Sequence, residues 1–303
     1  MEDIISVVIT TYGRTKELKN AINSVLLQTY KNLNIIVVDD NVDNNISKEV
    51  VKIINSFEDN RITYIKNKTN LGGALSRNVG IENSIGNYIA FLDDDDEYLP
   101  EKIQKQYELF KSSNNNLALV YCYCKAVKNN KIVSVYKYDY RGNCIYDAMK
   151  TCIAATSQWM CKKEALIDVG MFTNSPCKQD SIVILKLLLK GYEIDRVPEV
   201  LSIYNEDGSS RISTKGALKR IEGENILHDL CVKNYDKIND DEQREIEYNF
   251  ALNTIFYYYE LDDKSNYKKC LKIINSIHRF SRGSIKIKYI LTKKKIKKIF
   301  SKK

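Results

Sequence analysis

The chain has 303 residues, 44% of them hydrophobic, with only 12 glycines and 3 prolines. This composition is typical of a globular protein with a large core and excludes long disordered linkers. The formal net charge is +8, but residues 281–303 carry +10 and contain no acid, so residues 1–280 carry −2 and lack the basic character of a general nucleic-acid binder.

The sequence favours a cytoplasmic protein with free thiols. No apolar stretch approaches the roughly 20 residues needed to cross a bilayer. The chain opens Met-Glu-Asp, without a charged and then apolar leader, which predicts a cytoplasmic location. The eight cysteines lie mostly in apolar surroundings, so we expect buried free thiols and no disulfide framework.

The first hundred residues alternate strand and helix patterns. Residues 5–12 form a continuous β-branched run, typical of a strand buried on both faces, and a helical stripe of apolar residues follows it. The pattern recurs with strands at 35–38, 62–65 and 88–92, each followed by a helical segment. This alternation predicts a parallel sheet.

The rest of the chain is less regular. Further strands are expected at 117–127, 132–138 and 156–161, and helices at 163–169 and 181–190. Residues 214 to about 279 show helical periodicity with frequent charges. We therefore predict an α/β domain over 1–213, a helical region over 214–280 and a basic tail over 281–303.

Polar residues follow each of the first four predicted strands: Thr10 to Arg14, Asp39-Asp40, Gly72 to Arg77, and Asp93 to Asp96. In sheets of this kind ligands bind outside the carboxyl ends of the strands. Each motif alone has a simpler explanation as turn residues, a helix cap or a solvated charge. Their convergence on one edge of the sheet favours a binding site.

The run of four aspartates, Asp93 to Asp96, is the most informative motif. Its carboxylates repel one another, and Mg²⁺ or Mn²⁺ bound through one or two of them would complete its shell with water and substrate phosphates. This points to a nucleotide-diphosphate substrate. In an extended segment Asp93 and Asp95 share one face and Asp94 and Asp96 the other. The alternative is a solvated acidic turn that caps the helix beginning near Leu99.

Together, in this order and spacing, these motifs resemble a family 2 glycosyltransferase with the GT-A fold over roughly residues 4–210. The resemblance implies a mixed, mostly parallel sheet flanked by helices, with a C-terminal helical appendage. It implies Mn²⁺ or Mg²⁺ held by Asp95 and Asp93, with Asp95 the more direct ligand. It also implies nucleotide contacts from Thr10, Tyr12, Arg14, Asp39, Gly72, Arg77, Asp93 and Asp94.

The implied reaction is inverting transfer of a sugar from a nucleotide-sugar to a glycan or lipid-linked glycan. A carboxylate acceptor at Asp39 would favour uracil, and hence a UDP-sugar, because the uracil ring N–H is a donor. Asp180 is the candidate general base, since a helix N-terminus favours its ionised form. The alternative role for Asp180 is a helix N-cap. Many relatives have Glu-Asp where this chain has Gln179-Asp180.

Two further departures from the family pattern shape the expectation. Processive synthases carry Gln-x-x-Arg-Trp, whereas this chain has Ser157-Gln158-Trp159 without the arginine, which favours addition of a single sugar. Some relatives place a histidine near the metal or diphosphate. The two histidines here, His228 and His278, are expected to be structural or exposed residues of the helical region. The candidates for that contact are Asp207, Ser209, Ser210 and Arg211.

The basic tail predicts a membrane contact. Ile285, Tyr289, Ile296, Ile299 and Phe300 can share one face of a helix otherwise covered by lysines, a pattern typical of a helix on an anionic membrane. The enzyme would then be peripheral at the inner face of the cell membrane, near a lipid-linked acceptor. A solvated disordered tail is an alternative. A nucleic-acid arm is disfavoured by the sparse aromatic residues, so no nucleic-acid partner is expected.

Two competing functions use similar residues. A metal-dependent nucleotidyltransferase also combines an α/β sheet with carboxylates, but it usually opens with a Gly-rich phosphate loop, which Thr10-Thr11-Tyr12-Gly13-Arg14 is not. The other alternative is a membrane-associated adaptor that keeps the fold without turnover.

Overall fold

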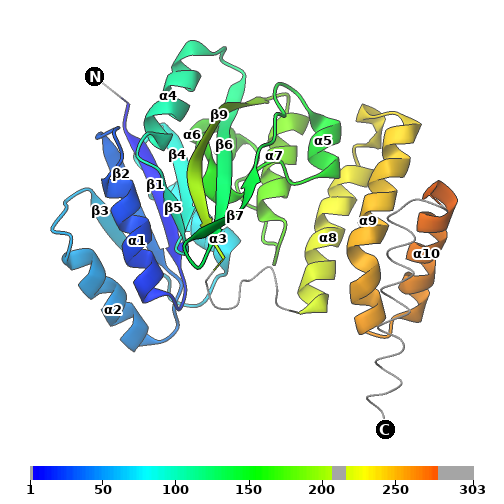
Figure 1. Ribbon diagram of the computed structural model, residues 1–303, viewed down its shortest axis with the longest axis horizontal. Helices are drawn as coiled ribbons and strands as arrows, with labels where there is room; N and C mark the ends of the chain where they lie inside the picture. Colours follow the sequence, from blue (N-terminus) through cyan, green and yellow to red (C-terminus); the bar gives the residue numbers. More distant parts are fainter. Residues whose placement is uncertain (1–2, 207–215, 279–303) are drawn as a thin grey trace, which may run out of the picture. The chain divides into compact units, whose positions relative to one another are not determined.

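The structure, a computed structural model, describes residues 3–206 and 216–278 (Figure 1). The chain divides near residue 211 into two compact units. The limits predicted at 213 and 280, the tail over 281–303 and the candidates Asp207, Ser209, Ser210 and Arg211 lie outside these ranges, so the predicted domain limits stay predictions.

The first unit is built on one mixed sheet. Its strands are β1 (Ile5–Thr11), β2 (Leu33–Asp39), β3 (Ile62–Lys66), β4 (Tyr88–Asp93), β5 (Asp96–Tyr98), β6 (Leu117–Lys128), β7 (Lys131–Tyr136), β8 (Trp159–Lys162) and β9 (Glu193–Asn205). The strand order is β3-β2-β1-β4-β8-β6-β9-β5, and β7 pairs with β6. The first four strands of this order are parallel, while β8 is antiparallel to both β4 and β6.

Helices cover the sheet. In the first unit they are α1 (Thr15–Leu26), α2 (Asn44–Asn55), α3 (Gly73–Glu82), α4 (Lys102–Ser112), α5 (Ile145–Lys150), η1 (Thr156–Gln158), α6 (Lys163–Asp168) and α7 (Gln179–Leu189). The α/β fold with a mostly parallel N-terminal half is thus as predicted. The run 156–161 is not one strand, because residues 156–158 form a 3₁₀ turn in which the Gln158 side chain accepts from the Ala155 amide at 2.9 Å.

Alternate residues of β1 pack on opposite faces of the sheet. Val7 and Ile9 belong to a core cluster with apolar residues of α1, α2 and α4, including Ile22 of α1. On the other face, α3 lies so close to β1 that a Cβ on Gly80 would fall 2.3 Å from the Val8 side chain. A strand buried on both faces is expected to be mainly apolar, and residues 5–9 are apolar except for Ser6, whose hydroxyl donates to Asn34 Oδ1 at 3.0 Å.

The parallel register brings the ends of the strands to one edge. Thr11 of β1 pairs with Asp39 of β2, and Thr10 pairs with Asp93 of β4. The polar residues that follow these three strands therefore start from one level of the sheet.

The second unit is helical. It contains α8 (Ala217–Val232), η3 (Tyr235–Lys237), α9 (Asp240–Glu260) and α10 (Lys264–His278). Its core joins Ile221 of α8 to Ala251 and Ile255 of α9 and to Cys270 and Ile274 of α10. The helical periodicity of the sequence thus corresponds to a packed three-helix layer with its own apolar centre.

All eight cysteines are free thiols, as predicted. Five of them are buried, at positions 122, 124, 161, 231 and 270. None of the helices in the described ranges has both the length and the apolar character to cross a membrane.

Candidate active site

Asp39 ends β2 with a fully buried carboxylate. Tyr64 of β3 donates its hydroxyl to Oδ2 at 2.7 Å, and the backbone and side-chain amides of Asn41 donate to Oδ1 at 2.8 and 2.7 Å. Lys66 Nζ lies 3.8 Å from Oδ1. An ionised carboxylate offers about four acceptor positions. The contact with a base N–H predicted for Asp39 is chemically compatible with these bonds and stays a prediction.

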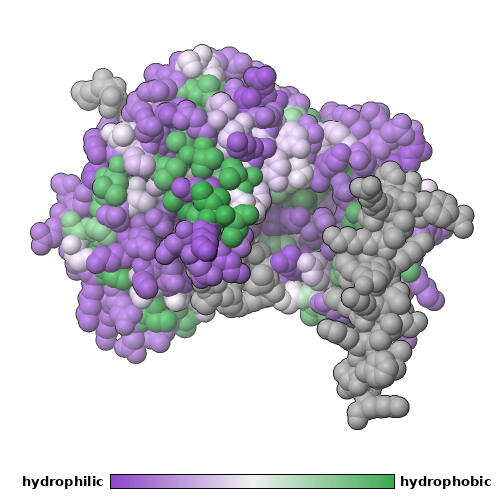
Figure 2. Space-filling view, in the orientation of Figure 1, coloured by the Kyte–Doolittle hydropathy of each residue, from purple (hydrophilic) through white to green (hydrophobic). Residues whose placement is uncertain are grey.

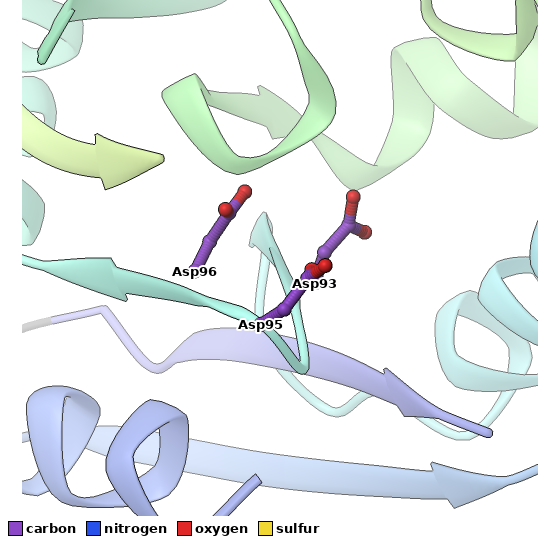
Figure 3. Close-up of side chains that lie close together, drawn as sticks. All are labelled: Asp93, Asp95 and Asp96. Carbon is purple, nitrogen blue, oxygen red and sulfur yellow. The ribbon is translucent and has the colours of Figure 1, made fainter. Parts of the chain in front are cut away.

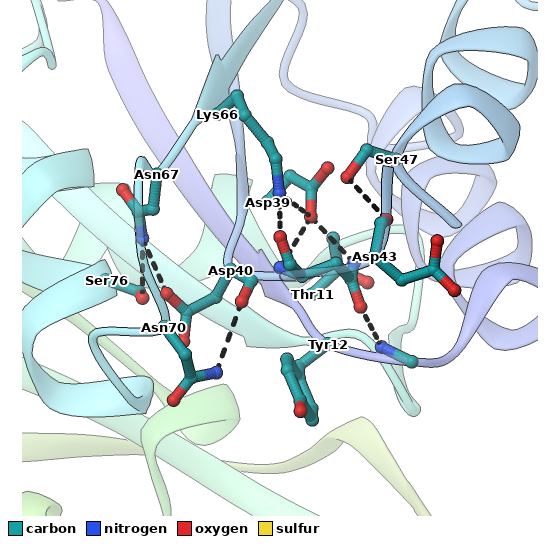
Figure 4. Close-up of polar contacts among 12 residues, drawn as sticks. Thr11, Tyr12, Asp39, Asp40, Asp43, Ser47, Lys66, Asn67, Asn70 and Ser76 are labelled. Carbon is teal, nitrogen blue, oxygen red and sulfur yellow. Dashed lines mark hydrogen bonds and ion pairs between the residues drawn. The ribbon is translucent and has the colours of Figure 1, made fainter. Parts of the chain in front are cut away.

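Asp40 connects β2 to the start of α3. Its carboxylate accepts from the Leu71 and Gly72 amides, both at 2.8 Å. It also accepts from Asn67 Nδ2 at 2.9 Å, a bond drawn in Figure 4. Gly72 has a φ of +80° and precedes the first residue of α3, a conformation that glycine adopts without strain. The Gly72 amide is therefore occupied by Asp40, and its predicted nucleotide contact stays a prediction.

Asp94 fastens the acidic run to the turn after β1. Its carboxylate accepts from the Thr11 hydroxyl at 2.8 Å, the Tyr12 amide at 3.1 Å and Arg14 Nη1 at 2.8 Å. Burial raises the pKa of Asp94 to about 6, against the opposing effect of Arg14. Both carboxylate oxygens serve the turn that holds Arg14 and Tyr12, so the structure places Asp94 as a brace of this turn. Direct contact between Asp94 and nucleotide stays a prediction.

Tyr12 is held by its backbone amide, and within the described part of the chain it is 56% exposed. Thr10, one position before the end of β1, is partly exposed. An exposed aromatic ring beside a carboxylate-lined edge is suited to stacking on a planar base.

The acidic run makes a turn. Residues Asp94 and Asp95 form the turn between β4 and β5, and ligand oxygens of Asp93, Asp95 and Asp96 lie within 4.8 Å of one another (Figure 3). The prediction that Asp93 and Asp95 lie together is confirmed. The prediction that Asp96 shares the face of Asp94 is wrong, because the turn separates them and sends Asp96 into the cluster. Three carboxylates at this spacing fit a hard divalent cation.

Ser157, in the 3₁₀ turn before β8, is bonded to two residues of the acidic run. Its hydroxyl accepts from the Asp93 amide at 3.1 Å and donates to Asp96 Oδ2 at 2.7 Å. Asn205 of β9 donates from Nδ2 to the Asp95 carbonyl at 3.0 Å. The roles of Ser157 and Asn205 were not predicted, because a single serine or asparagine in a strand-like segment gives no signal of the turn that it supports.

Two arginines pair with two of the three carboxylates of the cluster. Arg14 Nη1 lies 3.1 Å from Asp95 Oδ2, and Arg77 of α3 donates from Nη2 to Asp93 Oδ1. Arg77 also donates from Nη1 to Gln179 Oε1 at 2.6 Å, and its guanidinium lies over the Phe172 ring. Arg77 thus joins α3, the acidic run and the start of α7.

Asp180 lies in the first turn of α7. The helix begins at Gln179, and its N-cap residue is Lys178, which has a φ of +60°, so the N-cap alternative for Asp180 is wrong. Oδ1 of Asp180 accepts from the Ser181 amide at 2.8 Å, and Cys152 Sγ lies 3.5 Å from Oδ2. The neighbouring Gln179 is bonded to Arg77, which places Asp180 next in the chain to a residue of the site. The role of general base stays a prediction.

Two other residues considered in the sequence, Trp159 and His228, have structural contacts. Trp159 is fully buried and packs against Phe91 and Phe172. His228 lies in the helical unit, stacked on Phe250 and 2.9 Å from Glu247 Oε1, in the structural role predicted for it. The side chain of His278 lies outside the described part of the chain.

Comparison with known proteins identifies the family. Residues 6–170 match the family model described as glycosyl transferase family 2, which is more than half of the chain. An uncharacterized glycosyltransferase of Rickettsia felis is 40% identical over 149 residues, or 49% of this chain and 24% of that protein. The chain therefore spans about a quarter of the length of that relative.

A second relative aligns along most of its length. It is the Escherichia coli protein WfaP, named as a UDP-Glc:alpha-D-GlcNAc-diphosphoundecaprenol beta-1,3-glucosyltransferase, which is 27% identical over 237 residues, or 78% of this chain and 90% of WfaP. Among solved structures, residues 1–349 of Staphylococcus aureus TarS in complex with UDP-GlcNAc superpose with a TM-score of 0.60 at 16% identity, covering 91% of each chain.

The family model and the structural likeness agree with the site. The TarS superposition supports the GT-A fold, and the matched residues 6–170 contain the β1 turn, the β2 aspartates, Arg77 and the acidic run. The resemblance that the motifs indicated is confirmed, and the chain belongs to glycosyl transferase family 2.

Proposed function

We propose that this protein transfers one sugar from a nucleotide-diphosphate sugar, with UDP as the nucleotide, to a lipid-linked glycan. The observation that carries the proposal is the group of three carboxylates, Asp93, Asp95 and Asp96, flanked by Arg14 and Arg77 at the edge where an exposed Tyr12 is available for a base. Support for the acceptor class comes from WfaP, whose name specifies a diphosphoundecaprenol-linked acceptor and a UDP-linked donor.

The carboxylate cluster would hold Mn²⁺ or Mg²⁺. Asp95 and Asp93 are the proposed ligands, and Asp96 lies near enough to contribute an oxygen. When bound, such a cation neutralises charge that develops on the departing diphosphate. Oxygen-only donors are the set that these two cations prefer.

The protein's own residues would divide the remaining tasks. Tyr12 stacks on the base, and Asp39 accepts from its N–H. Arg77 and Arg14, both close to the cluster, hold the diphosphate oxygens by charge-assisted hydrogen bonds. Asp180 accepts the proton of the acceptor hydroxyl as that oxygen bonds to the anomeric carbon and the nucleoside diphosphate leaves from the opposite face. The product is inverted at that carbon.

We infer that Arg77 exchanges a hydrogen-bond partner when the donor binds. In the structure Arg77 pairs with Asp93 and donates to Gln179. A diphosphate is charged and can accept two hydrogen bonds from the guanidinium, so it is a stronger partner than the neutral amide of Gln179, and the donor would draw Arg77 away from Gln179. Glutamate at 179 would instead hold Arg77 by charge.

The proposed setting of the reaction is the cytoplasmic face of the cell membrane. The predicted tail over 281–303 would hold the protein there, and the domain limits 1–213, 214–280 and 281–303 complete the proposed organisation. Addition of a single sugar is proposed because no arginine precedes Trp159, unlike the Gln-x-x-Arg-Trp motif of processive synthases.

Thermal unfolding with UDP, GDP, CDP and TDP, each with and without Mn²⁺, tests the donor class. A ligand at about 100 times its dissociation constant adds about 2.7 kcal/mol to the free energy of unfolding. We expect stabilisation by UDP that requires Mn²⁺ and is lost in Asp95→Asn. Absence of any response from a folded sample would favour the adaptor alternative.

A product assay separates the two enzyme classes. Incubation with UDP-glucose or UDP-N-acetylglucosamine and a diphosphoundecaprenol-linked sugar is expected to release UDP. Release of pyrophosphate from a nucleoside triphosphate and a sugar phosphate would instead support the nucleotidyltransferase alternative.

A further inference from the structure

The hairpin formed by β6 and β7 is exposed and unusual. Its two-residue turn, Asn129 and Asn130, has φ values of +48° and +59°, the conformation of a type I′ turn that fits the twist of a hairpin. All six residues of β7 are exposed. Within the described sheet β7 pairs with β6 alone, so its other edge is open.

The exposed strand is apolar. Ile132 is 61% exposed, Val133 48%, Val135 46% and Tyr136 37%. Figure 2 shows a patch of hydrophobic side chains over the part of the first unit where Figure 1 draws β7, bordered by hydrophilic residues. An open apolar edge strand is an aggregation hazard in water, so natural proteins usually cover it or give it a binding function.

Within residues 125–138 the charged side chains have one sign. Residues 125–138 contain four lysines, at positions 125, 128, 131 and 137, and no aspartate or glutamate. Lys128 and Lys131 are cross-strand partners in the β6–β7 register. Like charges directly opposite each other destabilise a strand pair, and an anionic surface would remove that repulsion.

We propose that the β6–β7 hairpin docks on an anionic lipid bilayer. Ile132, Val133 and Val135 enter the interfacial layer, and the four lysines of residues 125–138 contact the lipid phosphates. A soluble anion would account for the lysines but not for the exposed apolar strand. Antiparallel pairing of two β7 strands would bring Lys131 of one copy near Lys137 of another, which disfavours a second copy as the occupant.

The turn end of the hairpin is connected to the candidate active site through β9. Val127, near the end of β6, pairs with Asn205 of β9, and Asn205 donates to the Asp95 carbonyl at 3.0 Å. A bilayer bound at the hairpin would therefore lie close to the acidic run. If the proposed function is right, this contact brings the donor site to the surface that holds the lipid-linked acceptor. The docking itself is independent of that function and of the tail over 281–303.

Tryptophan quenching tests the docking on the full chain. The only native tryptophan, Trp159, is fully buried, so a Val133→Trp variant reports on the hairpin. We expect vesicles of phosphatidylglycerol and phosphatidylcholine with brominated acyl chains to quench the introduced tryptophan, and vesicles of brominated phosphatidylcholine alone to leave it unquenched. Ile85→Trp is the matched control, because Ile85 is 68% exposed outside the hairpin.

Vesicle sedimentation measures how much the hairpin contributes to the affinity for anionic vesicles. We expect combined Ile132→Ser, Val133→Ser and Val135→Ser substitutions to weaken binding to anionic vesicles at least about tenfold, since three buried aliphatic side chains are lost. Lys128→Gln with Lys131→Gln should weaken it similarly at low salt. The thermal shift with UDP and Mn²⁺ should stay unchanged in both variants, which separates loss of docking from loss of the donor site.

Three results would overturn the docking proposal. The first is quenching at position 133 no greater than at position 85, which would assign any vesicle binding to another segment. The second is unchanged sedimentation of the hairpin variants. The third is a concentration-dependent dimer that the serine substitutions dissociate, which would assign β7 to a second copy. Quenching at position 133 without any response to UDP would support the docking and count against the proposed function.

Discussion

Two groups of aspartates stand at the same edge of the sheet, and their charges are balanced in different ways. Asp39 and Asp40 at the end of β2 accept chiefly from neutral donors: backbone amides, asparagine amides and the Tyr64 hydroxyl. The run after β4 is balanced by guanidinium groups, with Arg14 on Asp94 and Asp95 and Arg77 on Asp93.

This difference indicates a structural role for the β2 aspartates and a ligand-binding role for the run after β4. The amides of Leu71 and Gly72 belong to the chain that starts α3, so they cannot leave Asp40 without moving the helix. An arginine side chain can rotate from a carboxylate to a phosphate while the backbone stays in place. We infer that the β2 pair mainly builds the site and that the β4 run exchanges partners within it.

The largest expected effect is on turnover. Replacing Asp95 with asparagine removes one charge from the cluster of Asp93, Asp95 and Asp96 without changing the size of the side chain. We expect turnover of the UDP-sugar to fall about 10³-fold, about 4 kcal/mol in activation free energy, with the thermal unfolding midpoint within a few degrees of the parent. Initial rates of UDP release measure the loss.

Asp168→Asn is the matched control for this substitution. Asp168 is a partly exposed carboxylate paired with Lys190 away from the acidic run, so turnover should be unaffected. Equal rates for the parent and Asp95→Asn would remove the acidic run from the chemistry and leave the two groups of aspartates indistinguishable.

Asp40 should show the opposite behaviour. Replacing Asp40 with alanine leaves the Leu71 and Gly72 amides without their acceptor and Asn67 Nδ2 with the Ser76 hydroxyl alone. At 1 to 3 kcal/mol for each buried donor, partly relieved by water, we expect a loss of about 4 kcal/mol in the free energy of unfolding. Urea unfolding measures it. A loss below about 1 kcal/mol would show that the bonds to Asp40 are replaceable and would contradict its architectural role.

Buried runs and motif order made much of this arrangement predictable. The strands β1, β2 and β4 are mainly apolar, so their ends, and the polar residues after them, could be located from the sequence. The short strand β5 and the long strand β9 were not predicted. β5 has three residues, and β9 contains Pro198 and four charged residues, so neither forms an apolar run.

The relative positions of the four aspartates could not be predicted, because they are set by a turn. Alternation predicts the faces of an extended strand, but the chain reverses at Asp94 and Asp95 because Asp94 is bonded to Thr11, Tyr12 and Arg14, which are about 80 residues earlier in the sequence. Such long-range partners leave no local pattern. The membership of Asp96 in the cluster and the bracing by Ser157 could therefore be found only in the folded chain.

Lys102 extends the comparison to a buried cation with neutral partners. It is fully buried, donates to Gln106 Oε1 at 2.9 Å and lies 4.0 Å from the Tyr98 ring centre. Burial lowers the pKa of Lys102 to about 8 from its usual 10.5. Between pH 8 and 10.5 the unfolded chain holds this proton and the folded chain does not, so this group makes the free energy of unfolding rise with pH, by at most about 3 kcal/mol.

Lys102→Met removes that contribution, because methionine does not titrate. Urea unfolding of the parent and the variant from pH 7.5 to 10 is expected to give a difference in free energy that changes in favour of the parent as the pH rises. Tyrosines and cysteines titrate in both proteins, so their contributions cancel when one free energy of unfolding is subtracted from the other. A constant difference would mean that the neutral partners hold Lys102 charged in the folded protein.

The smallest expected effect is that of Tyr64→Phe, which tests whether Asp39 is mainly structural or available to a ligand. Burial and the adjacent carboxylate raise the pKa of Tyr64, so its hydroxyl stays a donor to Asp39 Oδ2. Tyr64→Phe removes the bond to Asp39 and the hydroxyl's contact with Ser47, and it leaves both Asn41 donors. We expect a loss of about 1 kcal/mol in urea unfolding, with the Mn²⁺-dependent stabilisation by UDP retained. A loss as large as that of Asp40→Ala would make Asp39 a second architectural carboxylate. A small loss leaves one of its oxygens available to the N–H of a base, which is the property that a uracil site requires.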